Sequence, residues 1–276
     1  MKINENTTVV IRGAGDLATG IAHRLYRCGF KIIMLEVRQP MAIRRRVAFS
    51  EAVYDGTITV EGVTARFAQD VAQALKIISE NSIAVLIDPE ARLLDELKPL
   101  ALVDAIMAKK NLGTSMDMAP IVIGVGPGFC AGLDCHAVVE TQRGHNLGKV
   151  IFSGRARENT GIPGEILGFS KERVIYAPAD GKIKVFHDIG SIVKAGCVVA
   201  EVSGTPVEAS IDGVVRGMIR DGTEVFKGMK IGDVDPRQIV DYCYTISDKA
   251  RAIGGGVLEA ILYFMNFAPK RSDEYC

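Results

Sequence analysis

Short apolar runs separated by glycine-rich turns make up the first part of the chain. A β-branched run over residues 7–11 predicts a buried parallel strand, and an apolar run over residues 31–36 predicts a second one. Between them, apolar residues recur at helical spacing from Ala18 onward and predict a helix that ends before Gly29. This part of the chain is therefore expected to form a strand-helix-strand unit.

The same alternation continues through the middle of the chain. Strands are predicted over residues 63–67, 82–88, 100–107 and 120–125, and a helix is predicted near residues 71–78. This alternation is typical of an open α/β sheet, and we expect a Rossmann-like parallel sheet within residues 1–173. Asp88, Asp104 and the run 124–128 follow predicted strands, so we expect them to gather on the edge where parallel sheets bind ligands.

The first predicted strand leads into Gly13-Ala14-Gly15-Asp16-Leu17-Ala18, which has the form G-x-G-x-x-A. In this motif Gly13 permits a tight turn, Gly15 lets a pyrophosphate approach the backbone, and Ala18 lets the helix pack closely on the strand. A phosphate would bind at the helix N-terminus. We predict a nucleotide-type site here; the alternative is a tight turn that binds no ligand.

Four charged residues near this motif bear on its ligand. Glu36, at the end of the second predicted strand, can accept hydrogen bonds from ribose hydroxyls, whereas Arg38 can bind a 2′-phosphate. Asp16 would cap the helix amides and repel a phosphate, and Arg12 is expected to offset that repulsion. The candidate cofactor-binding residues are Arg12, Gly13, Gly15, Asp16, Ala18, Glu36, Arg38, Gly126 and Gly128.

A glycine-rich segment over residues 126–136 ends in three adjacent candidate catalytic residues, Asp134, Cys135 and His136. On an extended segment the aspartate and the histidine share one face and the cysteine takes the other. Thiols and imidazoles are the usual nucleophiles and soft-metal ligands, but the cysteine spacing matches no standard zinc site, so we predict no metal. We expect these residues to project over the same edge as the Gly13 turn; the alternative is that they are ordinary loop residues.

A repeat with an offset of 32 residues occupies residues 174–235. Asp180-Gly181 recurs as Asp212-Gly213, and Gly190, Val193 and Gly196 recur as Gly222, Val225 and Gly228. The pattern predicts two interlocked β-halves and resembles the biotinyl/lipoyl barrel-sandwich hybrid. Because no lysine occurs between Lys194 and Lys227, the usual amide attachment of a cofactor is excluded. The segment is expected to be a rigid β-module for docking or for shaping a cleft, or a purely structural appendage.

Residues 236–276 are expected to form C-terminal helices. An N-cap at Asp235 followed by a proline predicts one helix, and an apolar stripe predicts another from about Ser247. Three consecutive glycines, residues 254–256, interrupt the second helix, and each costs roughly 1 kcal/mol relative to alanine. We therefore expect another backbone to approach them closely, within the chain or across a dimer.

Composition narrows the class of protein. The 276 residues include 33 Lys+Arg, 33 Asp+Glu and 48% hydrophobic residues, which are globular values, and the balanced charge argues against nucleic acid as a partner. The compact run Arg44-Arg45-Arg46 is interpreted as a solvated helix face rather than a contact for an anionic ligand. No apolar run is long enough to span a bilayer, no signal peptide pattern is present, and the six cysteines form no CxxC pair. We therefore expect a cytoplasmic protein with reduced thiols and no membrane partner.

Several phrases of the sequence resemble the YqeB family, over nearly the whole chain. These phrases are Ile123-Gly124-Val125-Gly126-Pro127-Gly128-Phe129, His136-Ala137-Val138-Val139-Glu140-Thr141, Arg143-Gly144-His145-Asn146-Leu147-Gly148 and Asn159-Thr160-Gly161-Ile162-Pro163-Gly164. The resemblance implies an accessory protein that matures selenium-dependent molybdenum hydroxylases, with the hydroxylase apoprotein as partner and a molybdopterin dinucleotide as cofactor. The nucleotide-binding start is also similar to that of the accessory proteins that sulfurate and insert the cofactor of xanthine dehydrogenase.

Two functional hypotheses follow. The first is a binding protein, rather than a typical enzyme, that holds a pyrophosphate-containing molybdopterin cofactor on the turn from Gly13 to Ala18. The alternative is an NAD(P)-dependent oxidoreductase, in which Glu36 or Arg38 selects NAD or NADP and His136 or Asp134 relays a proton.

Overall fold

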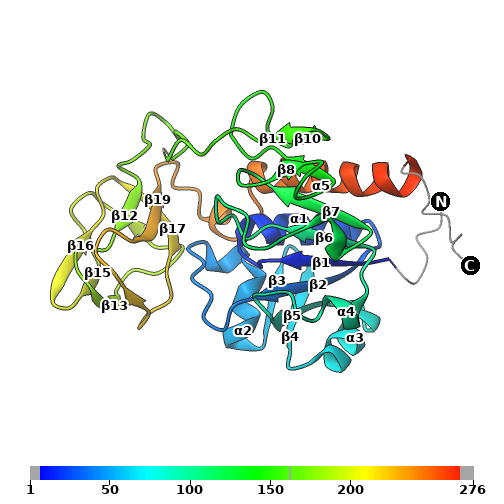
Figure 1. The fold of residues 1–276 in the computed structure, drawn as a ribbon. Helices are drawn as coiled ribbons and strands as arrows, with labels where there is room; N and C mark the ends of the chain where they lie inside the picture. Colours follow the sequence, from blue (N-terminus) through cyan, green and yellow to red (C-terminus); the bar gives the residue numbers. More distant parts are fainter. Residues whose placement is uncertain (1–6, 162, 268–276) are drawn as a thin grey trace, which may run out of the picture.

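A nine-stranded sheet forms the centre of the computed structural model, which describes residues 7–161 and 163–267 (Figure 1). The strand order is β10-β9-β7-β6-β1-β2-β5-β4-β3. These strands are β1 (Thr8–Arg12), β2 (Lys31–Glu36), β3 (Thr57–Val60), β4 (Val63–Ala68), β5 (Ile83–Ile87), β6 (Ala101–Asp104), β7 (Ile121–Val125), β9 (Ala137–Val139) and β10 (Val150–Ile151). Together with further antiparallel sheets, they make a mixed α/β fold.

The strands from β9 to β4 run parallel, and β10 and β3 pair antiparallel at the two edges. β2 and β5 lie on one side of β1, and β6 and β7, which come later in the chain, lie on the other side. The direction of winding thus reverses between β1 and β6. In open parallel sheets such a switch point leaves a crevice beyond the carboxyl ends of the strands, where ligands bind.

The strands predicted from the apolar runs are confirmed as β1, β2, β4, β5, β6 and β7. The largest difference is at β6, which ends at Asp104 rather than at residue 107, because the Asp104 carboxylate accepts a hydrogen bond from the Ile106 amide and turns the chain. The short apolar runs predict these strands because a strand that is buried on both faces is apolar along its whole length.

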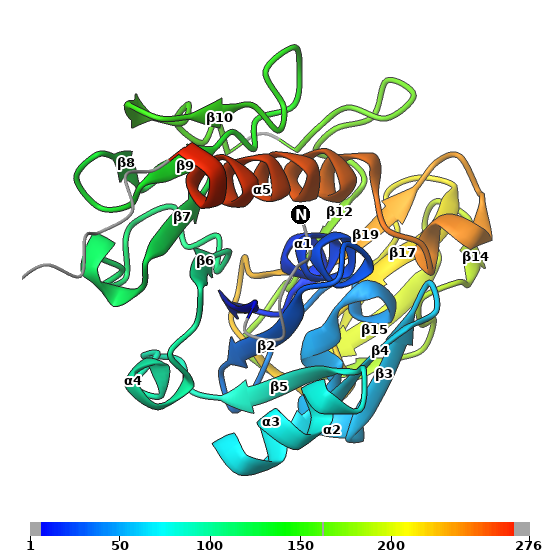
Figure 2. The ribbon, with the colours of Figure 1, turned by 90° about the vertical axis from the view of Figure 1, so that its right-hand side faces the viewer.

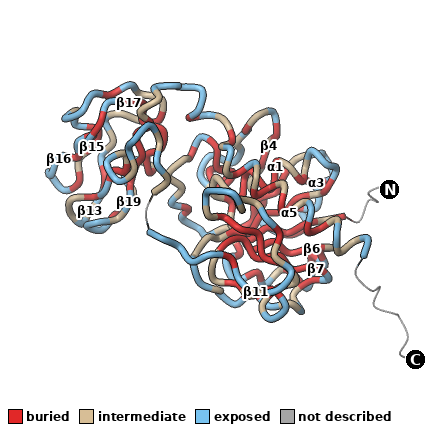
Figure 3. The backbone as a smooth tube through the Cα atoms, turned by 90° about the horizontal axis from the view of Figure 1, so that it is seen from above, coloured by how far each residue is buried: buried red, intermediate tan, exposed pale blue. Residues whose placement is uncertain are grey.

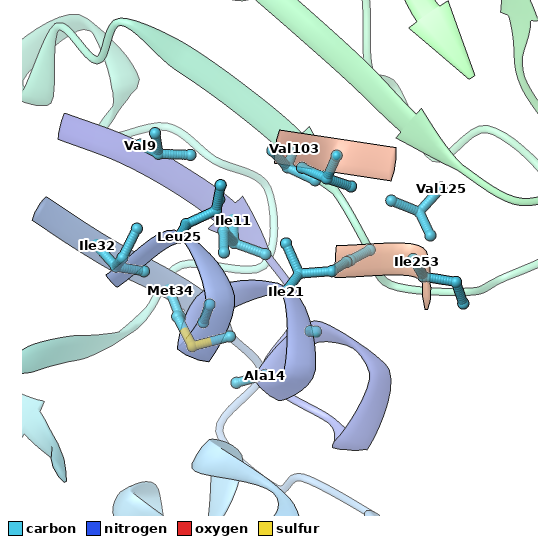
Figure 4. Close-up of a cluster of buried hydrophobic side chains, with 14 of the residues drawn as sticks. Val9, Ile11, Ala14, Ile21, Leu25, Ile32, Met34, Val103, Val125 and Ile253 are labelled. Atoms are coloured by element: carbon cyan, nitrogen blue, oxygen red, sulfur yellow. The ribbon is translucent and has the colours of Figure 1, made fainter. Parts of the chain in front are cut away.

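Helices cover both faces of the sheet. The α-helices are α1 (Asp16–Arg27), α2 (Ala52–Asp55), α3 (Val71–Ser79), α4 (Leu94–Leu97) and α5 (Asp248–Phe267), and the 3-10 helices are η1 (Arg45–Val47), η2 (Phe49–Glu51), η3 (Met116–Met118) and η4 (Val240–Cys243). α1 and α5 pack in one apolar core with side chains of β1, β2 and β7, whereas α3 and α4 pack in the core of the other face. Figure 4 shows Ile21 of α1 and Ile253 of α5 beside Ile11 of β1.

The glycines of α5 allow this helix to approach other segments of the same chain. A Cβ atom at Gly254 would lie 3.0 Å from the Gly20 carbonyl oxygen of α1, and a Cβ atom at Gly256 would lie 2.2 Å from the Gly148 carbonyl oxygen. At Gly255 no atom lies within 4 Å of the added Cβ. The close approach predicted from the sequence is therefore made within the chain at Gly254 and Gly256.

α1 and α5 pack against each other at a crossing angle, so that Figure 2 shows α5 lengthwise and α1 nearly end-on. Gly20 faces Ala250, and four residues further along both helices, Gly254 faces Arg24. The Arg24 guanidinium also donates to the Arg251 carbonyl, 227 residues away in sequence. The two N-termini are consequently at the same end of the helix pair.

Residues 174–235 form a β-module with its own apolar core, beside the α/β part of the chain (Figures 1 and 3). Its two four-stranded sheets contain β12 (Val174–Tyr176), β19 (Lys230–Asp235), β17 (Gly213–Met218) and β14 (Ile192–Val193), and β16 (Thr205–Glu208), β15 (Val198–Val202), β13 (Gly181–Val185) and β18 (Glu224–Val225). The strands β13, β14 and β15 begin 32 residues before β17, β18 and β19. β13 pairs with β18 and β14 pairs with β17, so the two predicted halves interlock.

The helix predicted to begin at Asp235 is not formed. β19 extends to Asp235, and the next helical residues are the short 3-10 helix η4. The carboxylate of Asp235 is fully buried, where it pairs with Arg216 of β17 and with Arg237. α5 is therefore the single α-helix within residues 236–267; residues 268–276 of the predicted helical part lie outside the described residues.

The basic run at residues 44–46 connects the β-module to the sheet, so its interpretation as a solvated helix face is wrong. Arg45 is buried, donates to the Met218 carbonyl and pairs with Asp188 of the β-module. The neighbouring Ile43 carbonyl accepts a hydrogen bond from the Met218 amide. Local composition predicts exposure of such a run, but segments far away in sequence cover the side chains of Arg44 and Arg45, and only Arg46 is exposed.

Candidate functional site

The two glycines of the turn between β1 and α1 have different roles. Gly13 has φ +91°, and a Cβ atom there would lie 3.1 Å from the Ala105 carbonyl oxygen after β6, so the turn itself requires this glycine. Gly15 has φ −67°, which any residue adopts, and its added Cβ meets no atom within 4 Å. The folded chain therefore leaves open space in front of Gly15.

That space is a cavity of about 450 Å³, here called the α1 cavity, beyond the carboxyl ends of β1 and β6. It is lined by the first turn of α1, the loop after β6, the start of α5 and the β-module. Its cationic residues are Arg44, Arg143, Arg173, Arg216, Lys230 and Lys249, against the acidic residues Asp16 and Asp233. The excess of cations and the positive end of the α1 dipole both favour an anionic ligand.

Most of the arginines of the α1 cavity are held in place by acceptors of the chain. The Arg44 side chain donates to Asp16 and to the carbonyls of Tyr242 and Thr245. Arg173 pairs with Asp233. Such pairs fix the orientation of the guanidinium groups, so the cavity is organised before any ligand binds.

Asp16 does not cap α1, in contrast to the prediction. No side-chain hydrogen bond caps the helix at Gly15, and the Asp16 carboxylate pairs with Arg44 at 3.3 Å. Arg12, predicted to offset Asp16, instead lies buried with its guanidinium against Asp104 and Thr114. Its role is to join the end of β1 to the end of β6, and Arg44 takes the predicted place beside Asp16.

Glu36 and Arg38 also differ from their predicted arrangement. The Glu36 carboxylate accepts hydrogen bonds of 2.8 Å from the Ala14 amide and from the Val37 amide, and burial raises its pKa. Glu36 thus holds the glycine turn in shape from the end of β2. Arg38 is exposed, and it lines neither the α1 cavity nor the cavity adjoining it.

Gly126 and Gly128 lie just beyond β7 and serve loop packing. Added Cβ atoms would lie 2.8 Å from the Thr141 hydroxyl at Gly126 and 2.7 Å from the Lys110 backbone at Gly128. Pro127 between them lines a second cavity of about 310 Å³, here called the adjoining cavity. The two cavities share Met107, Arg143, Gly164 and Lys249.

Asp134, Cys135 and His136 lie at the opposite edge of the sheet from Gly13, so their predicted position is wrong. The His136 amide donates to the Val122 carbonyl near the start of β7, because the chain returns along the sheet through β8 (Cys130–Ala131), which pairs with β11 (Gly154–Arg155), before it enters β9. The Asp134 carboxylate accepts a hydrogen bond from the Cys130 amide, and His136 Nδ1 accepts one from the Val122 amide. The Cys135 side chain is fully buried in the apolar core.

We expect Cys135 to be unreactive in the folded protein. Burial raises the pKa of its thiol to about 11, so the thiolate that attacks alkylating reagents is scarce at neutral pH. Alkylation with iodoacetamide followed by peptide mass spectrometry should label the exposed Cys28 in the native protein and Cys135 only after unfolding. Labelling of both at similar rates in the native state would contradict the buried position.

The chain thus combines a mixed α/β fold with a cationic cavity at a glycine turn. It is 56% identical over 266 residues to the uncharacterized protein YqeB of Escherichia coli strain K12, which supports the YqeB family that the sequence phrases indicate. The match takes in 96% of this chain and 49% of YqeB, so the chain spans about half the length of this curated relative. No protein-family model matches the chain.

Solved structures resemble the chain only distantly. An aspartoacylase family protein from Mesorhizobium loti is 11% identical with a TM-score of 0.29, over 83% of this chain and 85% of that one. The apo ectoine utilization protein EutE from Ruegeria pomeroyi is 10% identical with a TM-score of 0.24, over 83% and 86%. Similarity at this level carries no argument about fold or activity. No helix within residues 7–161 and 163–267 is long and apolar enough to cross a membrane.

Proposed function

We propose that the chain is an accessory protein that binds a pyrophosphate-containing cofactor of the molybdopterin dinucleotide type in the α1 cavity. The observation that carries the proposal is the α1 N-terminus, which opens at Gly15 into a cavity lined by six cationic and two acidic residues. Oxygen-rich anions are the ligands that such a surface binds best, because the helix amides and the arginines both donate to them.

The topology supports a dinucleotide rather than a simple anion. The order β5-β2-β1-β6-β7-β9 corresponds to the Rossmann order, with the glycine turn at its switch point. The β-module, with its interlocked repeat, supplies Arg216 and Lys230 to the wall of the same cavity, and Arg173 directly precedes the module. This favours a cleft-shaping role over a purely structural one.

The residues that would hold the cofactor are the backbone at Gly15 and the cationic side chains of the cavity, with Arg44 oriented by Asp16. When bound, the cofactor would supply molybdenum-dithiolene chemistry; the chain's part is to bind and shield it. The role in maturing selenium-dependent hydroxylases, and the hydroxylase apoprotein as partner, rest on the family resemblance.

The test is native mass spectrometry of freshly purified protein, combined with phosphate, molybdenum and selenium analysis. A bound mass of a molybdopterin dinucleotide is the expected result. Tight binding of NAD(H) or NADP(H) in a titration, together with hydride transfer to a carbonyl substrate, would overturn the proposal in favour of an oxidoreductase.

A further inference from the structure

A second helix begins at the α1 cavity. Ser247, which precedes α5, and Lys249 in its first turn line the cavity together with Gly15 to Ala18 of α1. Since the starts of both helices line this cavity, the positive ends of both dipoles lie at one space. The sequence motif identifies only the first of them.

Lys249 is the cation of this second helix start. Its side chain is half-buried and lines both the α1 cavity and the adjoining cavity. Among the described residues its ammonium makes no hydrogen bond or close ion pair, and burial and the nearby Arg143 lower its pKa. A bound anion would stabilise this charge, whose desolvation the carboxylates of Asp16, Glu140 and Asp248 offset only in part.

Two of the three carboxylates that interact with Lys249 are paired with arginines, whereas the third, Glu140, accepts hydrogen bonds from three backbone amides. Asp248 is held by both terminal nitrogens of Arg143, which lowers the pKa of its carboxyl to about 2. Asp16 is paired with Arg44. The Arg44 side chain, only 10% exposed, also has a buried Nε without an acceptor in the described residues. A buried unpaired donor in the same wall is a second sign that an anion belongs there.

We propose that the start of α5 and Lys249 form a second phosphoryl subsite, so that the cleft binds two linked phosphoryl groups, one at Gly15 of α1 and one at Lys249. This inference rests on the proposed function and deepens it. It assigns a binding residue to each group and restricts the ligand class to pyrophosphate-bridged molecules, in preference to those with a single phosphoryl group.

The test is isothermal titration of the full chain with inorganic pyrophosphate and with orthophosphate at constant ionic strength. The wild-type protein should bind pyrophosphate more tightly by about tenfold or more, because a second charge-assisted contact is gained. Lys249→Gln should lower pyrophosphate affinity about tenfold and orthophosphate affinity less than about twofold, while Lys249→Arg should keep the preference. Lys76→Gln, at an exposed lysine of α3, is the matched control and should change neither affinity.

Two results would overturn the second subsite. The first is equal affinity of the wild-type protein for pyrophosphate and orthophosphate. The second is an equal loss of affinity for both ions in Lys249→Gln, because such a loss would reflect only the change in overall charge. Gly15→Val tests the proposed function separately. If that variant loses the dinucleotide while Lys249→Gln shows no selective effect, the nucleotide site stands and only the second subsite is wrong.

Discussion

Gly256→Ala is expected to lower the free energy of unfolding by about 1 to 3 kcal/mol, whereas Gly255→Ala should raise it by up to about 1 kcal/mol. The two glycines are adjacent in α5, but only the first would place a methyl group against a backbone carbonyl, that of Gly148. A backbone carbonyl cannot move aside as a flexible side chain can. The added methyl group therefore forces α5 to shift away from the loop that contains Gly148. At Gly255 the methyl group meets nothing and the gain is helix propensity alone.

Urea denaturation monitored by circular dichroism measures both changes. The pair is its own control, since the two variants add the same methyl group to the same helix. If both variants gained stability, the approach of α5 to Gly148 would be wrong; if both lost it, α5 would be packed on its outer side as well.

Gly15→Val is expected to lower dinucleotide affinity by at least about 100-fold, or nearly 3 kcal/mol, with little effect on folding. The branched side chain would occupy the space at the α1 N-terminus and keep a phosphate from the helix amides. The backbone at Gly15 is extended and its Cβ position is empty, so the fold itself tolerates a side chain. The loss of a good N-cap residue costs about 1 kcal/mol.

Cofactor retention by native mass spectrometry and pyrophosphate titration measure the affinity, and thermal unfolding verifies the fold. Gly15→Ala is the matched control and should give a smaller loss, because a methyl group fills less of the space. Gly13→Ala would be a poor substitute, since its positive φ and its contact with Ala105 make that change destabilising in itself. Unchanged affinity in folded Gly15→Val would contradict the nucleotide site.

The strands of the sheet and the helix α1 could be predicted because their signals are local. A parallel strand buried on both faces is a short apolar run, and the glycine turn has fixed spacing to the strand before it. The same local rules placed Glu36 correctly at the end of β2. They did not predict that its carboxylate would accept a hydrogen bond from the Ala14 amide. Which backbone amides of a turn lack a partner depends on the conformation of the turn, and the sequence pattern does not specify that conformation.

The position of Cys135 and His136 shows where local rules fail. The glycine-rich segment before them suggests a loop that stays at the carboxyl edge of the sheet. In the structure the chain crosses back through β8, and β9 begins at the opposite edge. The number of residues between β7 and β9 permits either path, so the edge at which these residues lie is decided by packing rather than by sequence pattern.

The cations of the α1 cavity could not be grouped from the sequence either. Arg44, Arg143, Arg216 and Lys249 come from four separate parts of the chain, and only Arg44 belongs to a basic run. The net charge of the whole chain is zero, so it gives no indication that cationic side chains gather at this cavity. Only the topology, which brings the β-module and α5 to the switch point, makes the cluster visible.

The pairing of α1 with α5 also sets the order in which the protein can fold during synthesis. α1 is made early, but its partner helix is 227 residues further along the chain, measured from Arg24 to Arg251. At translation rates of about 5 to 20 residues per second, that face of the sheet stays uncovered for roughly 10 to 45 s. Ile21, fully buried in the finished protein, is exposed to chaperones or to other nascent chains for all of that time, and Val125 is exposed from its own synthesis onward. The α1 cavity therefore cannot form until α5 has been synthesised.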